Sequence, residues 1–156
     1  MKFKILILCF FFSLSSSSQT LDETIDWIGS NSEGLAQVMY DESTGVLTLI
    51  KVQQLGPRSI MAFVSEIDPK AVASIDIKYG SDEWNNIQLN FKTGGTNVKS
   101  YTVNKDWELT MDPINTHMYG FDINLKNSRD YLPKFKKAYL HLFRQIGIAV
   151  KDGDMF

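Results

Sequence analysis

The chain has 156 residues, with 16 basic and 18 acidic side chains, a net charge of −2, and 44% hydrophobic residues. This length suits one domain built around one hydrophobic core. The absence of a basic excess argues against nucleic acid as a partner.

Residues 1–18 have the organisation of an export signal. Two lysines precede an apolar run, Ile5 to Phe12, that is too short to span a bilayer, and serines fill positions 15–18. This order predicts cleavage after Ser18, or one or two residues earlier, which leaves one globular domain over residues 19–156. We expect an exported protein, periplasmic or extracellular, with the bacterial periplasm favoured.

The only cysteine, Cys9, lies inside the apolar run and follows Leu8 instead of a small residue, so lipid attachment is not expected. Cleavage would remove Cys9 together with Lys2 and Lys4. The mature chain would then hold 14 basic (16 − 2) and 18 acidic residues, a net charge of −4. It would have no disulfide, no cysteine-ligated metal and no apolar run long enough to cross a membrane.

The mature chain opens with a predicted helix. Thr20-Leu21-Asp22-Glu23 is a T-x-x-E capping box, and apolar residues then recur at helical spacing until a Gly/Ser/Asn-rich stretch at 29–34.

Alternating apolar and polar residues then predict about seven antiparallel strands with short turns. The stretch containing Trp107 and Pro113 shows no readable period and is left unassigned. The expected strands are 35–40, 46–52, 59–67, 72–79, 87–91, 98–104 and 119–125.

A second amphipathic helix is predicted near the C-terminus, with Asp130 as N-cap and Pro133 in its first turn. Gly147 is expected to end it in a Schellman motif, with Ile148 near Phe143. One face should pack on the core through Leu132, Phe135, Tyr139, Leu142, Phe143 and Ile146.

The opposite face of this helix carries a basic stripe, Lys134, Lys137, His141 and Arg144. Charged outer faces are the default on amphipathic helices, so we interpret the stripe as solvent-facing. The competing hypothesis is a ligand-binding site for a phosphate, a lipid head group or an acidic partner.

Few other residues indicate chemistry. His117, the second histidine, is interpreted as a strand-end residue, and no histidine spacing typical of a metal site occurs. There is no G-x-S-x-G, and Gly94-Gly95 precedes no helix that would make a phosphate loop. The sequence therefore predicts no catalytic residue, no metal and no cofactor.

The strand pattern and last helix resemble the pleckstrin-homology-like roll, in which the last helix closes one corner of two near-orthogonal sheets. The segments that carry this resemblance are "IDPKAVASIDIKYG", "NNIQLNFK" and "LPKFKKAYLHLFRQIG". The chain also resembles small exported bacterial proteins that end in a Lys-rich "F/Y-x-x-L" helix. A lipocalin-like barrel and an NTF2-like cone are the alternative architectures.

Together these features predict a mainly β, α+β fold with an N-terminal helix and a C-terminal amphipathic capping helix. For function we expect an exported, non-enzymatic binding module whose partner is a protein or an anionic surface. The alternatives are a barrel-type carrier of a small apolar ligand and a small hydrolase.

Overall fold

A computed structural model describes residues 19–32, 36–56, 59–79, 84–126 and 130–153. The predicted export signal, residues 1–18, lies outside the described residues. The described parts form two helices, one short 3-10 turn and nine strands. Their bounds are α1 Leu21–Asn31, β1 Ala36–Asp41, β2 Val46–Gly56, β3 Ser59–Ile67, η1 Pro69–Ala71, β4 Val72–Tyr79, β5 Trp84–Phe91, β6 Thr96–Asn104, β7 Leu109–Met118, β8 Gly120–Lys126, α2 Leu132–Gln145 and β9 Lys151–Asp152.

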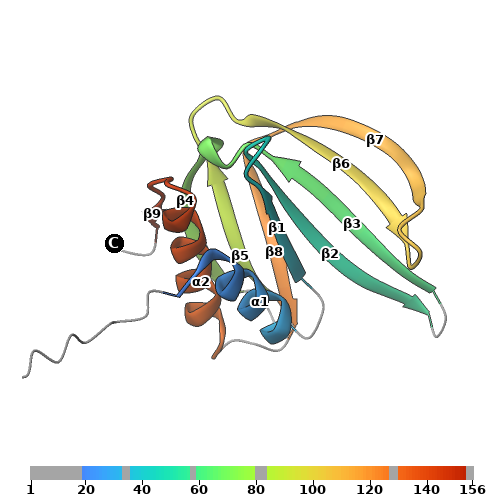
Figure 1. Cartoon of the computed structure of the whole chain (residues 1–156), viewed down its shortest axis with the longest axis horizontal. Helices are drawn as coiled ribbons and strands as arrows, with labels where there is room; N and C mark the ends of the chain where they lie inside the picture. The colour runs from blue at the N-terminus through green and yellow to red at the C-terminus, as the bar shows by residue number, and fades with distance from the viewer. Residues whose placement is uncertain (1–18, 33–35, 57–58, 80–83, 127–129, 154–156) are drawn as a thin grey trace, which may run out of the picture.

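The strands form two sheets that share one corner (Figure 1). Sheet A has the order β1-β2-β3-β6-β7, and sheet B has the order β8-β5-β4-β9. The chain passes between the sheets at β3–β4, at β5–β6 and at β7–β8. All pairings are antiparallel except that of β4 with β9.

The mainly β, α+β class is thereby confirmed. The described strands form two open sheets and no closed barrel. The resemblance to the pleckstrin-homology-like roll stays a prediction.

Nine strands are present where about seven were expected, because β7 and β9 were not predicted. The pairing of β7 with β6 shifts register on both sides of Thr102. An extra residue in a strand breaks the period-two alternation on which the sequence reading depends. Pro113, which cannot donate to a ladder, lies within the same strand and obscured the pattern further.

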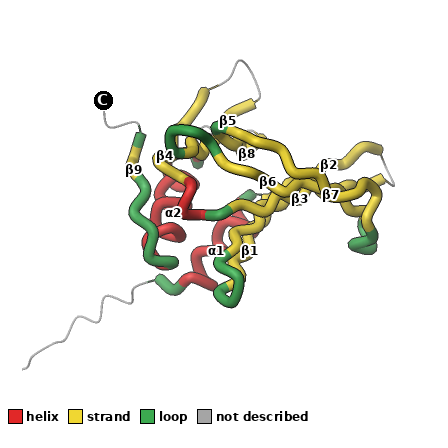
Figure 2. Tube along the Cα trace, turned by 90° about the horizontal axis from the view of Figure 1, so that it is seen from above, coloured by secondary structure: helices red, strands yellow, loops and turns green. Residues whose placement is uncertain are grey.

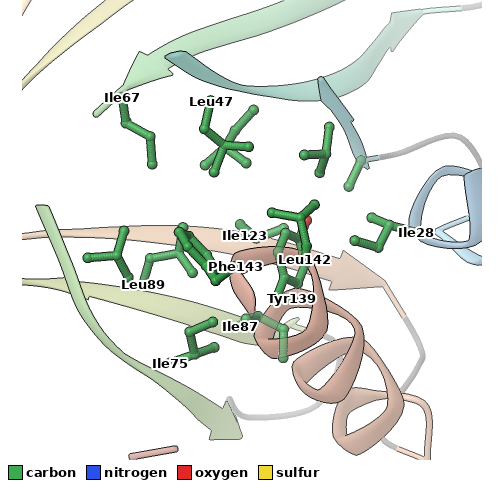
Figure 3. Close-up of a cluster of buried hydrophobic side chains, with 14 of the residues drawn as sticks. Ile28, Leu47, Ile67, Ile75, Ile87, Leu89, Ile123, Tyr139, Leu142 and Phe143 are labelled. Carbon is green, nitrogen blue, oxygen red and sulfur yellow. The ribbon is translucent and has the colours of Figure 1, made fainter. Parts of the chain in front are cut away.

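The main core lies between the two sheets, and α2 fills it. Figure 3 shows side chains of sheet A, such as Leu47, facing those of sheet B, such as Leu89, with Tyr139, Leu142 and Phe143 of α2 between them. Five of the six predicted core positions of α2 are buried, and Ile146 is partly buried against the same cluster. Complete burial raises the pKa of Tyr139 above its usual value.

Helix α1 begins at the predicted capping box. The Thr20 N–H donates to Glu23 Oε2 over 2.7 Å, and the Glu23 N–H donates to Thr20 Oγ1 over 3.2 Å. These bonds satisfy donors that a helix start leaves without intrahelical partners. Helix α1 packs on α2, where the rings of Trp27 and Phe135 lie with centroids 5.2 Å apart.

The end of α2 is as predicted, but its start is not. The Ile148 N–H donates to Phe143 O over 2.8 Å, and the Gly147 N–H donates to Arg144 O over 3.0 Å, which is the Schellman pattern. The prediction of Asp130 as N-cap is wrong. The N-cap is Tyr131, which makes no side-chain cap hydrogen bond, because its carbonyl already accepts the first N–H groups of the helix.

A glycine pair shapes the turn between β5 and β6, at the corner where the sheets meet. Gly94 and Gly95 both have positive φ, +97° and +69°. A Cβ on Gly95 would lie 2.5 Å from Met118 O, whereas a Cβ on Gly94 would meet nothing within 4 Å. Close approach of β7 to this turn therefore requires glycine at position 95.

Candidate functional site

The predicted basic stripe does lie on the outer side of α2, but its members differ in surroundings. Lys134, Lys137 and Arg144 are exposed, and His141 is half-buried. The Lys134 ammonium lies 4.8 Å from the ring centroid of Tyr131, within cation–π range.

His141 is engaged by the start of the mature chain. Its Nε2 lies 2.9 Å from the carbonyl oxygen of Gln19, and Gln145 Nε2 donates to the same oxygen over 2.8 Å. A carbonyl can only accept, so the tautomer that fits carries its proton on Nε2. His141 therefore holds a backbone group 122 positions away, a contact that helical spacing could not reveal.

The most buried charge on α2 is Lys136, which the sequence reading did not single out. Its ammonium forms an ion pair with Asp152 of β9, the two-residue strand that pairs in parallel with β4. The Lys136 side chain is 5% exposed and that of Asp152 is 40% exposed. This pair fastens the C-terminal segment to α2 and β4.

Because the two charges differ in exposure, the two ways of breaking the pair should differ in cost. Asp152→Asn removes the counter-charge of a buried ammonium and should lower the free energy of unfolding by about 2–3 kcal/mol. Lys136→Met keeps the apolar stem and leaves a carboxylate that water can solvate, so we expect a change within about 1 kcal/mol. Urea denaturation of both variants checks this order. Equal losses would contradict the buried-ammonium argument.

His117 is placed at a strand end, as predicted. Its Nε2 lies 2.7 Å from Gly94 O, its Nδ1 lies 3.2 Å from Asn97 Oδ1, and its ring meets Tyr119 edge-on at 5.4 Å. These contacts tie β7 to the β5–β6 turn, which is a structural role. No cluster of three metal-ligating side chains occurs within the described residues.

An open cleft of about 670 Å³ lies at the end of sheet A, between the β1–β2 turn, η1 and the C-terminal end of α2. Its charged side chains already have partners. Lys99 pairs with Glu66 at 3.1 Å, and the Asp68 carboxylate accepts from the Lys70 N–H at 2.9 Å. The cleft brings together no acid–base pair or nucleophile that would indicate catalysis.

The other end of sheet A carries a feature that the sequence reading missed. Strands β2, β3, β6 and β7 extend beyond the two helices (Figures 1 and 2). Phe63, Met111 and Ile114, 39%, 44% and 50% exposed, lie there on the face that continues from the core. We call these three residues the distal patch.

Strand register places the distal patch on one face. Phe63 pairs with Thr102, which pairs with Met111, and Ile114 pairs with Ser100 in the next row. Directly paired residues of an antiparallel sheet point to the same side. The same rows reach the core through Leu49, which lies opposite Ser65.

Small hydroxyl residues form the floor between these apolar side chains. Ser65 and Thr102 are buried. The hydroxyls of Ser65 and Ser100 lie 3.3 Å apart, and those of Thr102 and Thr110 lie 2.8 Å apart. Because these polar groups pair with one another, a ligand on the distal patch would meet an apolar rim over a floor whose hydroxyls already have partners.

More apolar side chains surround the distal patch at this end of sheet A. Trp107 follows β6 in the β6–β7 turn with φ +63°, and it is exposed. Leu109 and Ile60 are also exposed, on the opposite face of the sheet by register. Contiguous exposed apolar residues of this kind are typical of interaction surfaces.

The outer edge of sheet A is poorly suited to pairing with another strand. β7 is the edge strand, and it carries two register shifts, Asp112 and Pro113. Bulges, charges and proline on an edge are devices that prevent edge-to-edge association. Binding is therefore expected on the face of the sheet at the distal patch.

Comparison of the chain with protein-family models, with curated proteins and with solved structures gave no match. Neither helix of the described residues has the length and apolar character needed to cross a membrane.

Proposed function

We propose that this chain is an exported, non-enzymatic binding module that holds an apolar segment of a partner protein on the distal patch. The observation that supports this most strongly is the exposure of Phe63, Met111 and Ile114 on one face, beyond the reach of both helices. Burying such side chains against a partner contributes about 25 cal/mol per Å² of apolar surface removed from water.

The charges nearby favour a protein over an anionic membrane. Asp106, Glu108 and Asp112 flank the distal patch on the β6–β7 hairpin, with Lys105 as the one basic residue of residues 105–112. Acidic groups are repelled by anionic head groups. A protein segment with apolar side chains and basic flanks fits these surroundings.

A carrier of a small apolar ligand is less well supported. The pocket between β1, β2, β8 and Tyr139 has a volume of about 10 Å³, close to the minimum for one water molecule. The anion-site hypothesis for Lys134, Lys137, His141 and Arg144 stays a prediction, with His141 already bound to Gln19. The pleckstrin-homology-like resemblance is likewise proposed, on the position of α2 between the two sheets.

Photo-crosslinking in the exporting cell tests the proposal. A photoreactive amino acid at position 114 should give a discrete protein adduct, because Ile114 would lie inside the contact. The matched control places the same residue at Asp122, an exposed position of sheet B. Adducts of the same kind from both positions, or none from position 114, would contradict binding at the distal patch.

A further inference from the structure

The first residue of the mature chain is held on the folded domain. The carbonyl oxygen of Gln19 accepts hydrogen bonds from His141 and Gln145 of α2, and Thr20 follows at once as the N-cap of α1. The predicted cleavage after Ser18 would make this glutamine the N-terminal residue. The further inference rests on that cleavage and not on the proposed binding function.

A free α-ammonium at Gln19 would lie in an unfavourable place. It would stand one residue before the N-cap of α1, where the helix dipole already presents partial positive charge. It would also lie beside His141, on the face of α2 that carries Lys137 and Arg144. Asp22 and Glu23 in the first turn offset part of this charge.

We propose that Gln19 cyclises to pyroglutamate after cleavage, and that α2 holds the cyclised residue through its carbonyl. The α-amino nitrogen of Gln19 attacks Cδ of its own side-chain amide, an N–Cδ bond forms, the Cδ–Nε2 bond breaks, and ammonia leaves. No oxidant or second substrate is needed. The product is a neutral five-membered lactam.

The hydrogen bonds on the page are compatible with the product. Cyclisation consumes the α-amine and the side-chain amide, but it leaves the backbone carbonyl that His141 and Gln145 bind. The reaction therefore removes the unfavourable positive charge and keeps the anchor. A lactam terminus also offers no free amine to aminopeptidases.

Intact mass and N-terminal sequencing of the exported protein test the modification. We expect the mass of residues 19–156 less one ammonia, and a terminus that opens to Edman sequencing only after pyroglutamate aminopeptidase. Gln19→Asn is the matched control, because its shorter amide would have to close a strained four-membered ring; it should stay uncyclised. A terminus at Gln19 with its ammonia retained would overturn the proposal, and so would a mature chain that begins elsewhere.

Hydrogen exchange tests the anchor separately. In the double variant His141→Ala/Gln145→Ala, the amides of Glu23 and Thr24, which bond to Thr20, should exchange several-fold faster than in the parent protein. Lys137→Ala, an exposed change on the same helix, should leave them unaltered. Unchanged exchange in the double variant would overturn the role of His141 and Gln145.

Discussion

Replacing Tyr139 or Leu142 with alanine should each lower the free energy of unfolding by about 3–5 kcal/mol. Tyr139 is 1% exposed and Leu142 is 0% exposed, and both lie where α2 fills the space between the two sheets. Truncation there loses the transfer free energy of a large side chain and leaves a cavity that two sheets and a helix cannot close. Urea denaturation followed by tryptophan fluorescence measures the loss.

Lys137→Ala is the matched control for this prediction, because Lys137 is exposed on the same helix. It should change the unfolding free energy by less than about 0.5 kcal/mol. Losses below that value at both core positions would show that α2 is not docked between the sheets.

Gly95→Ala should destabilise the protein by at least about 3 kcal/mol, and Gly94→Ala by only about 1–2 kcal/mol. Both glycines have positive φ, so both changes impose the backbone strain of an L-residue there. Only at position 95 would the new Cβ also meet the Met118 carbonyl oxygen, at 2.5 Å. Relieving that clash requires β7 to move away from the turn.

Thermal and urea denaturation of the two glycine variants give the comparison directly. The difference between them isolates the close approach of β7, since strain is common to both. If the two variants lose equal stability, the contact between Gly95 and Met118 does not constrain the fold.

Local patterns predicted the parts of this structure that depend on neighbours in the sequence. The capping box at Thr20, the buried face of α2 and the Schellman motif at Gly147 each involve residues within about six positions of one another. Helical and strand periods carry that information directly. The same patterns gave the antiparallel, mainly β class.

Contacts between distant residues were not predictable in this way. The partner of Lys136 is Asp152 on β9, and that of His141 is Gln19, so spacing along α2 reveals neither. The distal patch was missed because β7 has an irregular register. Three apolar residues, Leu109, Met111 and Ile114, in an otherwise polar stretch were the one available signal.

The central claim is that the distal patch contributes to binding and not to the stability of the fold. A distal triple variant, Phe63→Thr, Met111→Gln and Ile114→Thr, keeps strand-compatible side chains while removing apolar surface. A matched triple variant on sheet B, Lys78→Thr, Gln88→Thr and Asp122→Thr, changes as many side chains on the other sheet.

Quantitative mass spectrometry of the proteins that co-purify with each form from the exporting cell tests this claim most directly. We predict that a specific partner found with the parent protein and the sheet B variant is lost from the distal triple variant, while all three forms unfold at similar urea concentrations. The same partners in equal amounts with all three folded forms would contradict the assignment of binding to Phe63, Met111 and Ile114.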